Sequence, residues 1–271
     1  MPALRNRTTP LHIRLLRLAR LKLHLLSGVI TAMFVLPLLS HTRREQHIRA
    51  WCGKLLATLN IRVSAHGEIP HADTRRALFV ANHISWIDVW ALKQLHVMNF
   101  VAKAEIRRWP VIGWLAASTG TLFIERERRS DAGHMMNGIA LTLQREECLC
   151  FFPEGTTTDG TELKPFKSSL FQAAINAEAM IWPVAIYYPR EDGGPNTAIA
   201  YHGDVTMLQS LWEVLKQREI VVELHFSAPM PAQGQERRHL SHHARQAISS
   251  LLHLRRHTAP DTPGGPPCAV R

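Results

Sequence analysis

The sequence has few cysteines and no recognisable metal-binding cluster. It contains four cysteines among 271 residues. Two of them, Cys148 and Cys150, alternate within an apolar run, which is typical of small hydrophobic residues in a strand. This usage predicts no disulfide framework and favours a body that faces the cytoplasm. His239, His242 and His243 have no neighbouring acid or cysteine, so we expect a solvated helix face and no metal.

Charge is unevenly distributed, and most of the chain has little excess of either sign. The net charge is +10, but residues 1–54 hold ten Lys and Arg against one acid, Glu45, so this segment alone carries +9. The remaining 217 residues carry 22 basic and 21 acidic side chains, which leaves +1. Because the body is nearly neutral and has no RNA-type aromatic signature, we expect no nucleic-acid partner.

Residues 23–42, LHLLSGVITAMFVLPLLSHT, contain no Lys, Arg, Asp or Glu. Twenty such residues just span a hydrocarbon core of roughly 30 Å. Polar residues interrupt the run, and basic residues flank both sides, so the positive-inside rule gives no clear orientation. We therefore expect residues 1–54 to form a helix or helical hairpin in the membrane interface. A buried core helix is the alternative, and a cleaved signal peptide is not expected because no A-x-A-like site follows.

From residue 61 onward, short β-rich runs alternate with helical patterns. The predicted strands are 61–65, 77–81, 100–102, 121–125, 148–152, 180–187, 198–201 and 220–226. The predicted helices are 87–95, 109–117, 130–144, 168–179, 207–216 and 236–253. This alternation predicts a layered α/β domain over residues 55–257, with a largely parallel central sheet flanked by helices. The Pro- and Gly-rich residues 258–271 are expected to form a disordered tail.

Residues 82–88, Asn-His-Ile-Ser-Trp-Ile-Asp, follow directly on the apolar run 77–81. On one continuous helix His83 and Asp88 would diverge by about 140°. They converge if His83 lies in a strand-to-helix turn, Ser85 caps the helix and Asp88 lies in its first turn. Asp88 would then fix the tautomer of His83 and stabilise its imidazolium. A capping box without any catalytic role is the alternative for Ser85 and Asp88.

Two further polar segments follow predicted strands. Residues 152–156, Phe-Pro-Glu-Gly-Thr, come at the carboxyl end of a strand, where α/β sheets bind ligands. Residues 120–126, Gly-Thr-Leu-Phe-Ile-Glu-Arg, end on Arg126, a side chain suited to bidentate phosphate binding. Each segment alone is also an ordinary turn or strand end.

In this order the segments resemble the four motifs of the glycerolipid acyltransferase family, in particular the bacterial lysophosphatidic acid acyltransferases. The motifs match at 82–88, 120–126, 152–156 and 181–184, and the resemblance covers about residues 50–226. The family usually has Arg after Glu-Gly-Thr, and this Arg is thought to hold the acceptor's phosphate, whereas this chain has Thr157. The Thr variant resembles members that acylate lyso-ornithine lipid, an aminolipid.

The resemblance implies a membrane-associated enzyme of phospholipid biosynthesis at the cytoplasmic face of the bacterial inner membrane. It would move a fatty acyl group from acyl-CoA or acyl carrier protein to the hydroxyl of lysophosphatidic acid, without a cofactor. Lyso-ornithine lipid is the alternative acceptor. A non-catalytic peripheral protein that binds anionic lipids is the alternative of another class.

The resemblance also implies roles for individual residues. His83 would be the general base and Asp88 its orienting partner. Substrate-binding residues would be Asn82, Lys103, Arg126, Glu154, Gly155, Thr156 and Lys167. Arg126 and Lys103 would bind the phosphate of the acceptor, and Glu154 would orient its polar head. Lys164 and Lys167, or Lys103, would supply the charge missing at Thr157. The oxyanion would be stabilised by Asn82 or by backbone N–H groups near Gly155, and residues 109–117 would form a wall for the acyl chain.

Overall fold

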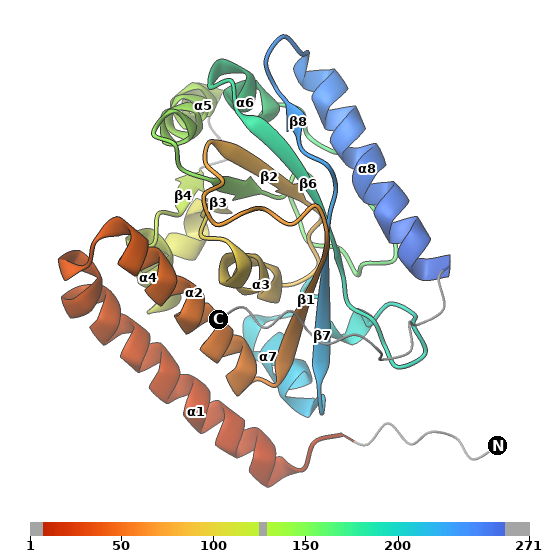
Figure 1. The fold of residues 1–271 in the computed structure, drawn as a ribbon. Helices are drawn as coiled ribbons and strands as arrows, with labels where there is room; N and C mark the ends of the chain where they lie inside the picture. The colour runs from red at the N-terminus through yellow and green to blue at the C-terminus, as the bar shows by residue number, and fades with distance from the viewer. Residues whose placement is uncertain (1–7, 125–128, 258–271) are drawn as a thin grey trace.

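The computed structural model describes residues 8–124 and 129–257 of the chain (Figure 1). The predicted tail, 258–271, lies outside the described residues. The described part is one layered α/β domain with an N-terminal helical hairpin against it (Figure 1). The predicted fold class is therefore confirmed.

The central sheet has eight strands within the described residues. Their order is β1-β7-β6-β2-β5-β3-β4, and β8 pairs with β6 outside this path. Only the β6–β7 and β6–β8 pairs are antiparallel. The strands are β1 (Ile61–Gly67), β2 (Ala77–Ala81), β3 (Asn99–Lys103), β4 (Leu122–Ile124), β5 (Leu149–Phe151), β6 (Met180–Tyr187), β7 (Ile220–Phe226) and β8 (Met230–Pro231). Since β2 to β6 run parallel, their carboxyl ends share one edge, and polar residues follow them there.

Helices cover both faces of the sheet, because side chains on successive residues of β2 point to opposite faces and all of them are apolar. Phe79 contributes to the core beneath α2 (His41–Thr58), α3 (Ile87–Leu95) and α7 (Met207–Lys216). Leu78 and Val80 point to the other face, beneath α5 (Arg129–Gln144), α6 (Phe171–Asn176) and α8 (Arg237–His257). Successive strand residues face opposite sides, and every residue of β2 is buried, as in a sheet covered on both faces.

Four predicted strands differ from the structure by one or two residues at their ends, and two further details of the strand pattern also differ. Residues 198–201 form no strand; the segment contains a short 3-10 helix, η4 (Thr197–Ile199). The N–H of Tyr201 donates to the carbonyl of Ile84 at 2.9 Å, so its backbone hydrogen bond joins the loop after β2 and not a sheet edge. The two-residue strand β8 was not predicted, because so short a run has no periodicity.

The N-terminal segment is a helical hairpin, which is one of the two forms that the sequence predicts, a single helix being the other. It runs from α1 (Leu11–Ile30) through a π-helical turn, η1 (Thr31–Val35), and a 3-10 turn, η2 (Leu36–Leu38), into α2. The uncharged run 23–42 is therefore the apex of the hairpin and not one straight helix. The predicted domain boundary at residue 54 falls inside α2, whose buried Leu55 and Leu56 belong to the main core.

The outer side of the hairpin is apolar and exposed. Leu11–Leu38 has a mean hydropathy of 1.8 in its most apolar window, and only 22% of that window is buried. By length and composition it is the one candidate membrane-spanning helix in the described residues. Its exposed large apolar side chains are Leu11, Leu15, Leu16, Leu23, Leu26, Ile30, Met33, Phe34 and Leu38.

Candidate active site

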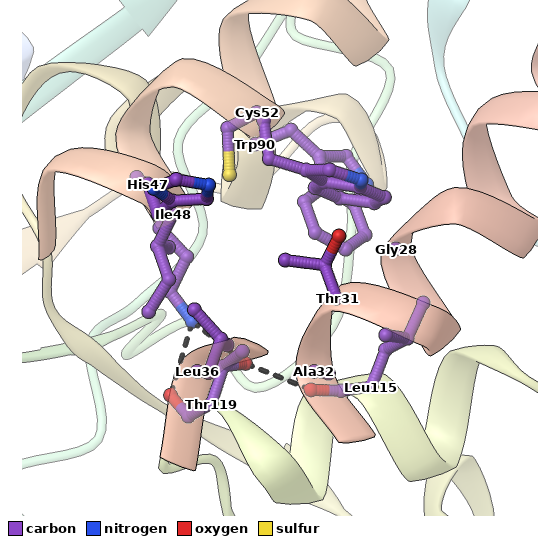
Figure 2. Close-up of a pocket in the computed structure, with 12 residues that line it drawn as sticks. Gly28, Thr31, Ala32, Leu36, His47, Ile48, Cys52, Trp90, Leu115 and Thr119 are labelled. Atoms are coloured by element: carbon purple, nitrogen blue, oxygen red, sulfur yellow. Dashed lines mark hydrogen bonds between the residues drawn. The ribbon is translucent and has the colours of Figure 1, made fainter. Parts of the chain in front are cut away.

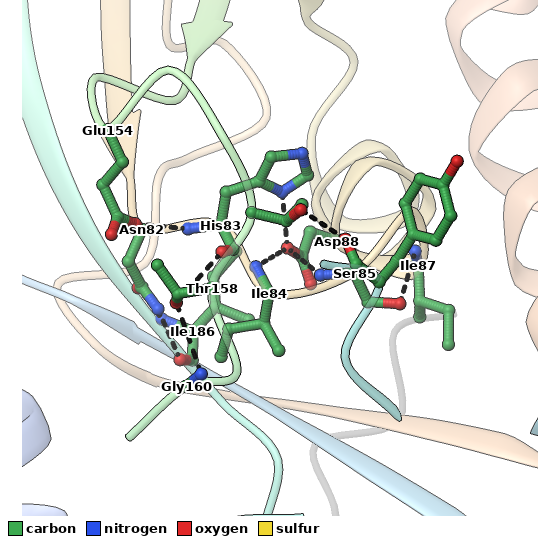
Figure 3. Close-up of polar contacts among 12 residues, drawn as sticks. Asn82, His83, Ile84, Ser85, Ile87, Asp88, Glu154, Thr158, Gly160 and Ile186 are labelled. Atoms are coloured by element: carbon green, nitrogen blue, oxygen red, sulfur yellow. Dashed lines mark hydrogen bonds and ion pairs between the residues drawn. The ribbon is translucent and has the colours of Figure 1, made fainter. Parts of the chain in front are cut away.

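His83 and Asp88 form a hydrogen-bonded pair at the carboxyl edge of the sheet, as the sequence predicts. Nδ1 of His83 lies 2.8 Å from Oδ2 of Asp88 (Figure 3). The Asp88 side chain is completely buried, whereas 19% of the His83 side chain is exposed. His83 lies in the loop between β2 and α3, and Asp88 lies in the first turn of α3. The carboxylate thereby fixes the ring so that Nε2 points away from it (Figure 3).

The Asp88 carboxylate is saturated with donors. Besides the imidazole, Oδ2 accepts hydrogen bonds from the backbone N–H groups of Ile84 at 2.8 Å and Ser85 at 3.0 Å. Oδ1 accepts a hydrogen bond from the Tyr188 hydroxyl at 2.5 Å. A buried carboxylate needs such partners because an unpaired charge away from water is very costly.

The predicted capping role of Ser85 is wrong. Helix α3 starts at Ile87, its N-cap is Trp86, and no side chain makes a capping hydrogen bond there. The Ser85 hydroxyl oxygen lies 3.5 Å from the N–H of Ile87, at the limit of a hydrogen bond. The carboxylate of Asp88 instead accepts hydrogen bonds from the N–H groups of Ile84 and Ser85 in this turn. The turn is thus organised around the carboxylate that holds His83.

Two site residues were missed from the sequence. The ring of Phe152 stacks on the His83 imidazole, with centroids 3.8 Å apart and planes 7° apart. Tyr188 follows β6, the strand that pairs with β2. Both directly follow a strand whose carboxyl end lies at this edge, as the segment that contains His83 follows β2. The stacked ring of Phe152 restricts rotation of the imidazole.

Glu154 connects the two motif loops. Its Oε1 accepts from the backbone N–H of His83 at 2.9 Å (Figure 3). Its Oε2 accepts from the backbone N–H of Lys164 at 3.0 Å. Burial raises the pKa of Glu154, and the two backbone hydrogen bonds act against that rise. Both carboxylate oxygens are used inside the protein. The contacts of Glu154 therefore hold the His83 backbone in place, while its predicted role at the acceptor head remains a prediction.

Both predicted oxyanion donors are engaged within the protein. The Asn82 amide pairs with the backbone of Ile186, donating at 3.0 Å and accepting at 2.7 Å. The N–H of Gly155 donates to the carbonyl of Phe152 at 3.0 Å, and Gly155 has a φ of 74° that suits glycine. The Asn82 side chain thus connects the end of β2 to β6 by hydrogen bonds. These contacts do not support a role of Asn82 in binding substrate.

The predicted cations Lys103 and Lys167 are both solvent-exposed. Lys103 is exposed at the end of β3, and Lys167 is exposed on the loop after Glu154. Arg126 lies outside the described residues. Thr156 is exposed, and the hydroxyl of Thr157 donates to the Tyr201 carbonyl. The position of the expected Arg is therefore occupied by a neutral side chain bonded to the protein backbone.

An apolar cavity of about 40 Å³ lies between the hairpin, α2, α3 and α4 (Ile112–Ser118) (Figure 2). Leu115, from the predicted acyl wall, lines it, whereas Trp114 and Val111 of that stretch are exposed. Lys93 closes one side, donating to the carbonyl and the hydroxyl of Thr119 at 3.2 and 3.1 Å. Burial lowers the pKa of Lys93 to about 8. The sequence did not single out this buried lysine.

The three C-terminal histidines are exposed on α8, as predicted, and the rings of His239 and His243 lie 4.1 Å apart. In the part of the chain that the structure describes, no three metal-binding side chains gather at one place.

Comparisons with known proteins identify relatives of this chain. Residues 60–187 match the family model described as Acyltransferase. A lyso-ornithine lipid O-acyltransferase of Pseudomonas aeruginosa is 38% identical over 209 residues, covering 77% of this chain and 79% of that protein. A 1-acyl-sn-glycerol-3-phosphate acyltransferase of Neisseria meningitidis is 35% identical over 185 residues, covering 68% and 72%.

A solved structure shares the fold. A 1-acyl-sn-glycerophosphate acyltransferase from Thermotoga maritima superposes with a TM-score of 0.72 at 18% identity, covering 95% of this chain and 99% of that one. With these relatives, the chain belongs to the acyltransferase family. Within the family it is an enzyme of the lysolipid acyltransferase type, which confirms the resemblance seen in its four motifs.

Proposed function

We propose that the protein transfers a fatty acyl group from a thioester, acyl-CoA or acyl carrier protein, to a lysolipid hydroxyl at a membrane surface. The observation that carries the proposal is the His83–Asp88 pair, with Nδ1 held by a buried carboxylate and Nε2 directed away from it (Figure 3). A hydroxyl is a poor nucleophile at neutral pH, so a base must remove its proton as the new bond forms. An imidazole titrates near neutral pH and suits this task.

In the proposed mechanism, Nε2 of His83 accepts the proton of the acceptor hydroxyl while its oxygen attacks the thioester carbonyl. Asp88 stabilises the imidazolium and keeps Nδ1 protonated. The imidazolium then returns the proton to the leaving thiolate as the tetrahedral intermediate collapses. Glu154 and Asn82 act indirectly, because their contacts fix the backbone on either side of His83. The thioester is already activated, so we propose no cofactor and no metal.

For the acceptor, we propose lyso-ornithine lipid, with lysophosphatidic acid as the second candidate. This reverses the order that the motifs alone favour. The support is Thr157, which presents no positive charge where a phosphate-binding Arg is expected. The Pseudomonas aeruginosa relative named for lyso-ornithine lipid also covers more of the chain than the Neisseria meningitidis relative does. The exposed Lys103 and Lys167 are the specific observation that keeps lysophosphatidic acid as a candidate.

The chemical step is tested by His83→Ala and Asp88→Asn in purified protein. We expect kcat to fall by roughly 10²–10⁴-fold in each, because general base catalysis contributes that much. His239→Ala, at an exposed histidine in the first turn of α8, is the matched control and should retain full activity. Full activity in the first two variants, or none in wild type with any thioester, would establish the non-catalytic lipid-binding alternative.

The acceptor is tested by supplying both lysolipids with each of the two thioester donors. We expect kcat/KM to be higher for lyso-ornithine lipid by roughly tenfold or more, because residue 157 offers no cation to a phosphate. The readout is the mass of the diacyl product. Preferential acylation of lysophosphatidic acid would restore the motif-based order and assign the phosphate to Lys103, Lys167 or Arg126.

A further inference from the structure

Tyr188 reaches the catalytic pair from a distant part of the chain. It follows β6, 100 residues after Asp88, and its hydroxyl donates to Oδ1 of Asp88 at 2.5 Å. The residue is only 2% exposed and packs in the core beneath α2, α3 and α7. Because β6 pairs with β2 in parallel register, the residue after β6 lies beside the loop that carries His83. Tyr188 is thus placed by the sheet itself.

The two oxygens of Asp88 have different tasks. Oδ2 accepts hydrogen bonds from the His83 ring and from two backbone N–H groups, whereas Oδ1 accepts the phenol of Tyr188. Rotation of the carboxylate about its Cβ–Cγ bond would break contacts on both sides. The phenol therefore holds the plane of the carboxylate in the orientation that directs Oδ2 at Nδ1.

We propose that Tyr188 is a positioning residue of the acyl-transfer reaction, acting on His83 through Oδ1 of Asp88. The inference rests on the proposed function, because it assigns a role within the same catalytic pair. Its donor hydrogen bond orients the carboxylate and draws negative charge away from Oδ2. The pair becomes a chain of three groups, phenol to carboxylate to imidazole, contributed by the residue after β6, by α3 and by the loop after β2.

The protonation of Tyr188 supports this role. Burial and the charge of Asp88 raise the pKa of Tyr188 well above its usual value, so the phenol stays a donor at any working pH. Two other titratable groups lie near the pair: Glu154, which interacts electrostatically with His83, and Cys150, which interacts with Asp88. Burial raises the pKa of both, and Tyr188→Phe leaves both in place.

The test compares Tyr188→Phe with Tyr187→Phe in the full-length protein. Tyr187 is the adjacent buried tyrosine, and its hydroxyl donates to the Gly193 carbonyl at 2.8 Å on the opposite face of the sheet. Each substitution removes one buried hydroxyl and keeps the ring. We expect kcat to fall roughly tenfold in Tyr188→Phe alone, with KM for both substrates unchanged, because hydrogen bonds to charged groups are stronger than neutral ones.

The pH profile gives a second readout that a packing role would not change. Without the phenol the Asp88 carboxylate is more basic and retains the imidazolium more strongly, so a higher pH is needed to free the base. The midpoint of the acidic limb of kcat/KM should move upward in Tyr188→Phe and stay in place in Tyr187→Phe. NMR of the His83 Nδ1 proton reports the same change without any turnover and serves if activity is too low to measure.

The outcomes separate this inference from the proposed function. If His83→Ala is inactive while Tyr188→Phe matches Tyr187→Phe in kcat, pH midpoint and the Nδ1 resonance, the positioning role is wrong and the acyltransferase mechanism stands. If His83→Ala is fully active, the proposed function fails. In that case a shifted Nδ1 resonance in Tyr188→Phe shows only the structural link between the three groups.

Discussion

At the scale of single residues, the site is built around a buried carboxylate. Asp88 accepts four hydrogen bonds, from His83, Ile84, Ser85 and Tyr188. Transfer of such a charge out of water is tolerated only when donors replace the lost hydration. The same donors prevent the carboxylate from turning, so the requirement for burial also supplies the rigidity that an orienting group needs.

Glu154 performs a similar task for the backbone, and Glu154→Gln tests it. One of the two oxygens becomes an NH₂ group that faces an N–H donor of His83 or Lys164, so at least one hydrogen bond is lost. We expect kcat to fall by roughly tenfold and stability to drop by about 1–3 kcal/mol. Steady-state kinetics and urea unfolding measure the two effects.

Glu147→Gln is the control for this substitution. Glu147 accepts a hydrogen bond from the Asn99 side chain at 2.6 Å, next to the start of β3 and β5 and so at the opposite edge of the sheet. The Glu147→Gln variant should have a lower free energy of unfolding and an unchanged kcat. An equal fall of kcat in both variants would show that Glu154 has no special connection to the site.

At the scale of elements, α8 is joined to the sheet by a buried ion pair. Nε of Arg255 lies 2.5 Å and Nη2 lies 2.9 Å from the two carboxylate oxygens of Glu223 on β7. His225 adds a contact of 3.2 Å from the same strand. Burial alone would raise the pKa of Glu223, but hydrogen bonds from His225 and Arg255 hold it at about 2.

This depressed pKa makes the attachment of α8 dependent on pH. A carboxylate with a folded-state pKa of about 2 against an ordinary 4.5 contributes stability above pH 4.5, which is lost as the pH falls from 4.5 towards 2. Glu223→Gln should therefore cost about 1–2 kcal/mol at pH 7 and progressively less below pH 4.5. Urea unfolding over this pH range measures the difference.

The control for the ion pair is Glu219→Gln. Glu219 pairs with Arg62 on the surface, where 45% and 69% of the two side chains are exposed. Exposed pairs contribute little, so this variant should change stability by less than about 0.5 kcal/mol at any pH. A constant difference between wild type and Glu223→Gln from pH 7 to pH 3 would contradict the assignment.

At the scale of the whole molecule, the hairpin presents an apolar surface beside a nearly neutral domain. Leu23, Leu26 and Phe34 are between 57% and 67% exposed, and basic residues flank the run. A soluble surface rarely gathers so many large apolar side chains, so we propose that this side of the hairpin lies in the membrane interface. Lysolipid and acyl chain would then reach the site without crossing water.

Replacing Leu23, Leu26 and Phe34 by Ser tests this placement. Each side chain is already exposed, so the fold should keep its stability while vesicle binding weakens by roughly 10²-fold or more. Sedimentation with vesicles containing anionic lipid gives the affinity. Leu208→Ser, at a leucine on α7 that is 78% exposed, is the matched control. Unchanged vesicle binding in the triple variant would rule out this surface as the anchor.

The sequence by itself determined the layered α/β architecture and the pairing of His83 with Asp88. Both depend on local patterns: the sequence predicts β2, β6 and β7 with their observed bounds, and the apolar runs of β2 and β7 lie between polar residues. The dyad depends on one strand-to-helix turn of a few residues. Such features need no knowledge of which strands become neighbours.

Only the tertiary structure decided how that pair is held. Tyr188 lies 100 residues from Asp88, and Glu154 lies 71 residues from His83, so their contacts exist only because β6 and β5 both pair with β2. The motif predicts that Asn82 binds substrate, and the same strand order places its amide against the backbone of Ile186. Strand order determines which side chains meet at the sheet edge. The hydrophobic periodicity of a sequence predicts where strands begin and end, but it does not predict the order of the strands in the sheet.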